Sequence, residues 1–112
     1  MKRFFLNALI MFIACAILSC SKPIPAEKSS YIGEWQSAIM GILITQDGKV
    51  SYKRIENGIT KSVEGPIKAF DGDNFEVGIG PFTTIFVVTV PPHQQDNDWK
   101  MTVDGVDLTK NP

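Results

Sequence analysis

Closely spaced turn signals constrain this chain more than any other feature of its sequence. They are Asp47-Gly48, Asn57-Gly58, Asp71-Gly-Asp-Asn74, Gly80-Pro81 and Asp104-Gly105. Asn-Gly and Asp-Gly pairs favour the two-residue turns that join antiparallel strands, because these residues tolerate positive φ. The segments between the turns are short, rich in β-branched and aromatic residues, and show no sustained 3.6-residue period. The sequence therefore predicts an all-β fold, a small antiparallel meander of about eight short strands in a curved sheet or compact barrel.

Counting from the first two turns predicts which residues of the neighbouring strands face one another. A two-residue first turn places Leu43 opposite Tyr52, and the second turn places Tyr52 opposite Val63. We expect these three side chains to form one row on the buried face, a cross-strand contact that stabilises a sheet. A break in the chain is expected downstream, at Gly65-Pro66.

The clearest hairpin lies near the C-terminal end. Alternating apolar and polar residues flank Asp104-Gly105, and a two-residue turn there places Val103 opposite Val106 and Met101 opposite Leu108. We expect these four side chains to face the core.

The first residues have the composition of an export signal. Lys2-Arg3 precedes an apolar run from Phe4 to Leu18 that only Asn7 interrupts. A basic start followed by an apolar region of about 15 residues is typical of a secretory signal peptide. The run is shorter than the roughly 20 apolar residues that a membrane-spanning helix needs. We therefore predict that residues 1–19 form a signal helix that is cleaved during export.

The sequence Ile17-Leu18-Ser19-Cys20 resembles the lipobox of bacterial lipoproteins. In that family an aliphatic residue lies three positions before the cysteine and a small residue lies directly before it. The resemblance implies that Cys20 carries a lipid anchor and becomes the first residue of the mature protein. Several acyl chains on one cysteine anchor a protein stably, whereas a single chain binds a bilayer only marginally. Leu18 departs from the Ala or Ser that is commoner at its position, and an ordinary cleaved signal or an uncleaved anchor are the alternatives.

Ser21 bears on where such a lipoprotein resides. In the Gram-negative sorting pattern an Asp at this position retains a lipoprotein at the inner membrane, so Ser21 implies the outer membrane, facing the periplasm. The resemblance thus predicts a membrane partner, contacted through the lipid on Cys20.

Composition divides the remaining chain into a tether and one small domain. We predict a lipidated cysteine and flexible tether over residues 20–30 and an all-β domain over residues 31–112. The tether contains two prolines, and at about 3.1 Å per residue it would reach roughly 30 Å. Beyond the signal the chain has nine basic and twelve acidic residues, so it offers no basic surface for nucleic acid.

The most apolar stretch of the predicted domain runs from Phe82 to Val90. Alternation directs one set of its side chains to the core: Phe82, Thr84, Phe86, Val88 and Val90. Ile85 and Val87 lie on the opposite face, and a strand that is apolar on both faces usually lies between two layers. We therefore predict that Ile85 and Val87 form a docking face for a second copy or another envelope protein. The alternative is that β-branched residues simply suit an exposed strand.

The residues that follow Val90 are predicted to leave the strand. Pro91-Pro92 is expected to end the strand, and His93 to Asp98 is expected to form a polar loop.

Two tryptophans are candidate ligand contacts. Gly33-x-Trp35 resembles the Gly-x-Trp motif of lipocalin-like β-barrels, in which the tryptophan plugs one end of the barrel. Trp35 and Trp99 can either contact a small ligand or serve as core aromatics. A barrel of such short strands is filled by its own side chains, which favours the core role.

No catalytic or metal-binding constellation is apparent. His93 is the only histidine, and its neighbours Asp96 and Asp98 are more simply explained as residues of a solvated loop. Asp71-Gly-Asp-Asn74 lacks the ligands of a calcium-binding loop and reads as a turn. We expect no enzymatic activity, no metal and no cofactor.

The sequence thus predicts a membrane-anchored envelope lipoprotein that acts as a structural or protein-interaction module. The alternative is a small-ligand-binding or inhibitor module of lipocalin-like or lysozyme-inhibitor-like type. A ligand module requires a pocket, whereas an interaction module requires only an exposed apolar patch.

Overall fold

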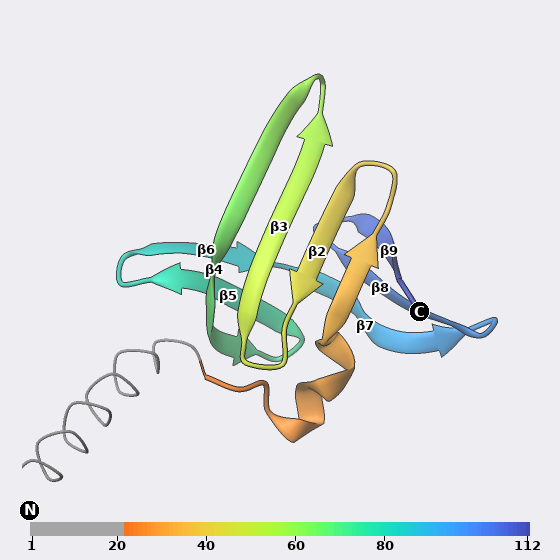
Figure 1. Ribbon diagram of the computed structural model, residues 1–112, viewed down its shortest axis with the longest axis horizontal. Helices are drawn as coiled ribbons and strands as arrows, with labels where there is room; N and C mark the ends of the chain where they lie inside the picture. Colours follow the sequence, from red (N-terminus) through yellow and green to blue (C-terminus); the bar gives the residue numbers. More distant parts are fainter. Residues whose placement is uncertain (1–21) are drawn as a thin grey trace, which may run out of the picture.

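The computed structural model describes residues 22–112, which form one antiparallel sheet of nine strands with a short 3-10 helix before it (Figure 1). The elements are η1 (Ala26–Tyr31), β1 (Gly33–Gln36), β2 (Met40–Ile44), β3 (Lys49–Glu56), β4 (Ile59–Asp71), β5 (Asn74–Ile79), β6 (Phe82–Phe86), β7 (Val88–Gln95), β8 (Asp98–Val103) and β9 (Val106–Lys110). The prediction of an all-β antiparallel meander is confirmed.

The sheet curls into a half-barrel because its first and last strands pair. The strand order is β6-β5-β4-β3-β2-β1-β9-β8-β7, so each strand neighbours the next along the chain except at one place. Trp35 on β1 lies opposite Lys110 on β9, which joins the first strand of the chain to the last. The free edges of the sheet are therefore β6 and β7, two consecutive strands that only Val87 separates.

Hydrogen bonds with Asp104 and Asn74 hold the β6–β7 junction, where β6 and β7 do not pair with each other. The carboxylate Oδ1 of Asp104 accepts the Val87 N–H at 2.9 Å, and the Asp104 N–H donates to the Val87 carbonyl at 2.8 Å. Asn74 Oδ1 accepts the Val88 N–H at 2.8 Å. The backbone at the junction is thus paired without any bond between β6 and β7, which is how backbone groups outside a ladder are usually satisfied.

The core lies inside the curl and takes side chains from the 3-10 helix and every strand. Its buried members are Tyr31, Trp35, Met40, Ile42, Ile44, Val50, Tyr52, Ile67, Phe75, Val77, Phe86, Val88, Met101, Val103 and Leu108. Aromatic rings join its parts: the Phe86 ring stacks on Phe75 with centroids 5.1 Å apart and meets the Tyr52 ring edge-on at 4.9 Å. Such pairs add about 0.5–1.5 kcal/mol each beyond their buried area.

The predicted register of the first hairpin is wrong by one residue. Tyr52 lies opposite Ile42, and Leu43 is an exposed residue opposite Ser51. The connection between β2 and β3 has three residues, not two, because the Thr45 N–H bonds to the Lys49 carbonyl. The extra residue turns each side chain of β2 to the other face, as a one-residue slip always does.

Other predicted registers are confirmed. Tyr52 lies opposite Val63 as expected. In the last hairpin Val103 lies opposite Val106 and Met101 opposite Leu108. Asp104 and Gly105 have φ of 48° and 79°, the positive values that a tight two-residue turn requires.

Gly65-Pro66 lies inside β4 and does not break it. Residues 59–66 pair with β3 and residues 67–71 pair with β5, so this dipeptide marks the place where the strand changes partner. The bend lets β5 and β6 cross the direction of β3 in Figure 1.

The predicted single strand from Phe82 to Val90 is divided at Val87. Phe86 and Val88 are buried as expected, whereas Phe82 is 84% exposed and Val90 is 41% exposed. The β5–β6 hairpin extends past the core, so its end has no opposing layer to bury Phe82. Pro91-Pro92 does not end β7, which continues to Gln95 with two irregularities in its pairing. Proline is tolerated there because β7 is an edge strand.

The predicted flexible tether over residues 20–30 is replaced in its second half by η1. Residues 26–31 form this helix, and Ile24 packs against the core. Tyr31, the first residue of the predicted all-β domain, ends the helix with its side chain buried. The first two residues of the predicted tether, and the predicted signal over residues 1–19, lie outside the described residues.

Candidate functional site

Lys110 occupies the space between the two tryptophans proposed as ligand contacts. Its Nζ lies 4.8 Å from the centre of the Trp35 ring and 5.1 Å from that of Trp99. The same Nζ donates a 2.8 Å hydrogen bond to the Ser30 carbonyl. A cation held between two aromatic rings is favourable by about 0.5–2 kcal/mol per contact.

Trp35 is a core residue in this arrangement. Its side chain has no exposed surface, and its indole N–H donates to the Tyr31 carbonyl at 2.9 Å. The structure therefore offers a ligand no surface on Trp35. Trp99 is half-buried and packs against the core beside Lys110.

Ile85 and Val87 are both exposed, with 60% and 44% of their surface accessible. Ile85 lies opposite Glu76 on β5. On its other side no strand of residues 22–112 pairs with β6, so Ile85 adjoins the free edge of the sheet. Ile79 and Phe82, which are 67% and 84% exposed, face each other across the end of the same hairpin. The β5–β6 hairpin is therefore apolar on both faces near its free edge.

The two free edges of the sheet differ in how they resist pairing with another strand. β7 has two prolines and two irregularities in register, features that discourage a further strand from adding to an edge. β6 has the sequence Phe-Thr-Thr-Ile-Phe, without a proline or a charge. An uncharged apolar edge strand is a template for association with another chain. Among the described residues, β6 is thus the edge best suited to accept a partner strand.

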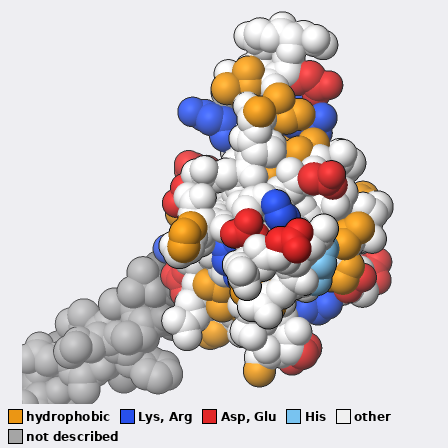
Figure 2. Space-filling model, turned by 90° about the vertical axis from the view of Figure 1, so that its right-hand side faces the viewer, with side chains coloured by type: hydrophobic (Ala, Val, Ile, Leu, Met, Phe, Trp, Pro, Cys, Tyr) orange, Lys and Arg blue, Asp and Glu red, His pale blue; other side chains and the backbone are white. Residues whose placement is uncertain are grey.

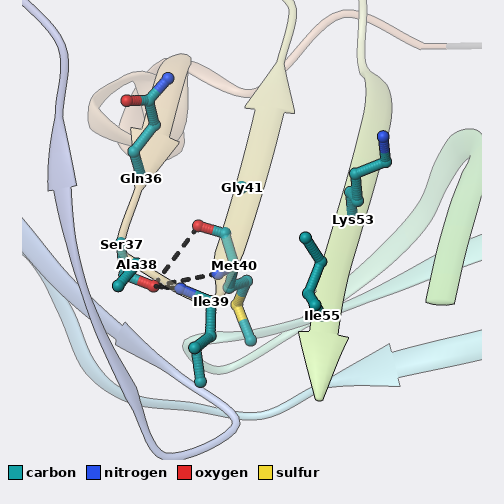
Figure 3. Close-up of a pocket in the computed structure, with 8 residues that line it drawn as sticks. All are labelled: Gln36, Ser37, Ala38, Ile39, Met40, Gly41, Lys53 and Ile55. Carbon is teal, nitrogen blue, oxygen red and sulfur yellow. Dashed lines mark hydrogen bonds between the residues drawn. The ribbon is translucent and has the colours of Figure 1, made fainter. Parts of the chain in front are cut away.

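A shallow cavity of about 230 Å³ lies where β1 turns into β2, on the outer face of the sheet (Figure 3). Its lining residues are Gln36, Ser37, Ala38, Ile39, Met40, Gly41, Lys53 and Ile55. Gly41 lies opposite Lys53 and leaves a notch in the surface because it has no side chain. Ser37 holds the turn by accepting the N–H groups of Ile39 and Met40 at its hydroxyl, at 3.2 and 3.0 Å.

The cavity combines an apolar wall with one cation. Ile39 and Ile55 are 42% and 51% exposed, and Lys53 lines the cavity from β3 with its amine directed away from Ile39 in Figure 3. A small amphiphile or an apolar side chain of a partner fits these walls. The volume falls below the roughly 300–1,000 Å³ that is usual for small-molecule sites.

His93 has local partners only. Its Nδ1 lies 3.0 Å from the Pro91 carbonyl oxygen and its Nε2 lies 3.4 Å from Gln95 Oε1. The polar loop predicted over residues 93–98 is instead the end of the β7–β8 hairpin, which turns at Asp96-Asn97. Within residues 22–112 no three His, Cys, Asp or Glu side chains converge as metal ligands would.

Burial changes the ionisation of two groups beside the 3-10 helix. Burial, together with the smaller effect of the nearby Asp73 carboxylate, raises the pKa of the Tyr31 phenol to about 12. Burial between the tryptophans lowers the pKa of the Lys110 amine below its ordinary value. Both shifts reflect desolvation, which disfavours the charged form of a group.

Sequence reasoning missed two features of the surface, and only the first of them has a signal in the sequence. Val106, Leu108 and Lys110 alternate along β9, so all three side chains lie on the inner face. This alternation could have placed Lys110 beside Trp35. The exposure of Phe82 has no such local signal, because it depends on how far the hairpin extends beyond the core.

Comparison with protein-family models, with curated proteins and with solved structures finds no match to this chain. Among the described residues, the one helix is too short and too polar to cross a membrane. Cys20 and the lipobox-like sequence lie outside the described residues.

Proposed function

We propose that the chain is a membrane-anchored envelope lipoprotein whose β domain acts as a protein-interaction module. The anchor is the lipid on Cys20, and the resemblance of residues 17–20 to a lipobox supports it. The outer membrane, with the domain facing the periplasm, is the location that Ser21 favours.

The uncharged apolar edge of β6 carries the proposal of protein interaction. Its free side adjoins Ile85, and Phe82 lies at its start, both exposed. A strand from another envelope protein can extend the sheet here, gaining main-chain hydrogen bonds and burying these side chains. A second copy pairing β6 with β6 is the other source of such a strand, and the experiment separates the two.

The test compares two pairs of lysine substitutions. Ile85→Lys with Val87→Lys places charges at the β6 edge, and Leu43→Lys with Val90→Lys places them on similarly exposed apolar residues of β2 and β7. We expect the first pair alone to abolish partner capture by cross-linking in membranes, because buried unpaired charge is costly. A loss of self-association in sedimentation would identify the second copy as the partner. The same captured proteins and the same sedimentation for both pairs would refute the proposal.

A small-ligand module remains the second candidate because of the cavity between Ile39 and Ile55. Lys53 at its rim suits a ligand with an anionic group. Titration with fatty-acid probes, compared between the unmodified protein and Gly41→Leu, tests this candidate. A Cβ at position 41 would have only the Trp35 carbonyl oxygen within 4 Å, at 3.9 Å. A larger side chain can therefore enter the notch. Equal binding by both proteins would exclude the cavity as the site.

A further inference from the structure

The residues before the first strand are strapped to the end of the sheet. We call residues 22–31 the strap. The Ile24 N–H donates to the Gln46 carbonyl at 3.1 Å, and a Cβ built on Gly48 would lie 2.0 Å from the Lys22 carbonyl oxygen. The strap therefore rests directly on the turn between β2 and β3, beginning with the first described residue.

The second half of the strap is fixed to the turn between β4 and β5. Lys28 Nζ donates to the Gly72 carbonyl at 2.7 Å and lies 5.4 Å from the centres of the Tyr31 and Phe70 rings. The Tyr31 hydroxyl donates to the Asp73 carbonyl at 2.8 Å. Two turns at the same end of the sheet thus hold the strap at separate points.

This attachment shortens the link between the lipid and the domain. Cys20 precedes Lys22 by two residues, which can span about 7 Å at most when fully extended. The ten-residue tether expected from sequence would have reached roughly 30 Å. A lipid on Cys20 must therefore lie close to the β2–β3 turn.

The opposite end of β3 lies far from this turn. The eight residues of β3 separate Gly48 from Asn57, and at about 3.4 Å per residue they span roughly 27–30 Å. Figure 1 shows the strap at the lower end of the molecule and the β3–β4 hairpin rising from the upper side. We call residues 55–60, the end of this hairpin beyond the last pairing with β2, the arm. The cavity beside Ile39 lies toward the arm, because β2 runs from that region down to the β2–β3 turn.

We propose that the strap gives the anchored domain one orientation at the lipid surface. The β2–β3 and β4–β5 turns face the bilayer, and the arm projects away from it by about the length of one eight-residue strand. This inference rests on the proposed lipid at Cys20. It assigns the arm and the cavity to the surface that faces soluble or distant partners.

Energy transfer to lipid headgroups tests this orientation in the mature lipoprotein reconstituted into phosphatidylethanolamine–phosphatidylglycerol vesicles. Donor dyes are attached to Gln46→Cys, in the β2–β3 turn, and to Thr60→Cys, in the arm; both positions are exposed. With Cys20 acylated, the introduced cysteine is the single free thiol of each mature protein. We expect transfer from position 46 to be several-fold more efficient than transfer from position 60.

A spacer variant supplies the matched control. A Gly-Ser spacer of about ten residues between Ser21 and Lys22 restores a flexible tether. We expect the spacer to lower the transfer efficiency from position 46, so that the efficiencies measured from positions 46 and 60 become similar. Equal transfer from both positions without the spacer would overturn the orientation, and so would a difference that the spacer leaves unchanged. Mass spectrometry of the same samples separates these results from failure of the proposed function, because absence of an acyl mass on Cys20 would remove the anchor and the orientation together.

Discussion

The two ends of the β3 strand differ in how far other parts of the chain cover them. At one end the strap covers the β2–β3 turn, and its Ile24 packs against the core. At the other end the arm extends beyond β2, and all of its residues are exposed. Figure 2 shows this hairpin standing above the body of the molecule, and its exposed apolar residues include Ile55 and Ile59. A hairpin with few buried contacts is expected to open at low cost, whereas the covered end should open only with the whole domain.

The largest difference is expected from Trp35, which lies under the strap. Trp35→Ala removes a fully buried indole, its hydrogen bond to Tyr31 and the ring beneath Lys110. We expect a loss of about 3–5 kcal/mol in the free energy of unfolding, measured by urea denaturation. A loss below about 1 kcal/mol would show that the covered end contributes no more than an exposed surface.

Two glycines at opposite ends of β3 provide a closer comparison. Gly48 and Gly58 have φ of +87° and +75°, but a Cβ on Gly58 meets nothing within 4 Å whereas one on Gly48 collides with the Lys22 carbonyl. We expect Gly58→Ala to cost about 1 kcal/mol from backbone strain alone. Gly48→Ala should cost about 2 kcal/mol or more, because the strap must also move.

Amide hydrogen exchange identifies the cause of that difference. Gly48→Ala should reduce protection of the Ile24 amide, which bonds to Gln46, while Gly58→Ala should leave it unchanged. Equal costs for the two substitutions, with Ile24 still protected, would mean that the strap does not rest on Gly48 in solution.

The ionisation of Tyr31 gives the covered end a pH dependence at high pH. Its pKa of about 12 in the folded protein exceeds the ordinary value of 10.0, so the unfolded chain loses its proton first. Stability should therefore fall as pH rises from 10 toward 12. Tyr31→Phe should flatten this fall in urea midpoints measured across the same range.

Lys110 acts in the opposite direction. Its lowered pKa means that the folded protein releases this proton first, so this group adds stability as pH rises toward its ordinary value. Lys110→Met should therefore remove a rise in stability that ends near pH 10.5, at the start of the fall that Tyr31 causes. A Tyr31→Phe profile as steep as that of the unmodified protein would assign the pH dependence to other groups.

The smallest changes in stability are expected from substituting one isoleucine in the strap and one in the arm. Ile24→Ser removes a partly buried side chain of the strap and should cost about 1 kcal/mol. Ile59→Ser changes a side chain that is 64% exposed in the arm and should stay within about 0.5 kcal/mol. Thermal melting of both variants is sufficient, and the comparison fails if the arm substitution is the more costly.

Local chemistry made much of the fold predictable. The last hairpin was predicted to the residue because Asp104 and Gly105 accept positive φ, and the flanking alternation permits only one register. Tyr52 opposite Val63 followed from Asn57-Gly58 for the same reason. The candidate docking residues Ile85 and Val87 were found from alternation, and the structure leaves both exposed.

The remaining features depended on contacts between distant parts of the chain. Asp47-Gly48 has the same composition as Asp104-Gly105, yet its connection contains three residues, with Ile44 buried and Leu43 exposed. The division at Val87 depends on Asp104, which binds its backbone from the turn between β8 and β9, 17 residues further along the chain.

The sequence by itself determined that this chain forms an antiparallel meander, because turn chemistry and two-residue alternation act between near neighbours. Only the tertiary structure decided that residues 22–31 form a strap and that Lys110 lies between two tryptophans. The polar, proline-containing residues of the strap carry no periodic signal, and the alternation of β9 sets the face of Lys110 but not its partners. The positions of the strap and of Lys110 follow from the turns and rings that the curled sheet presents to them.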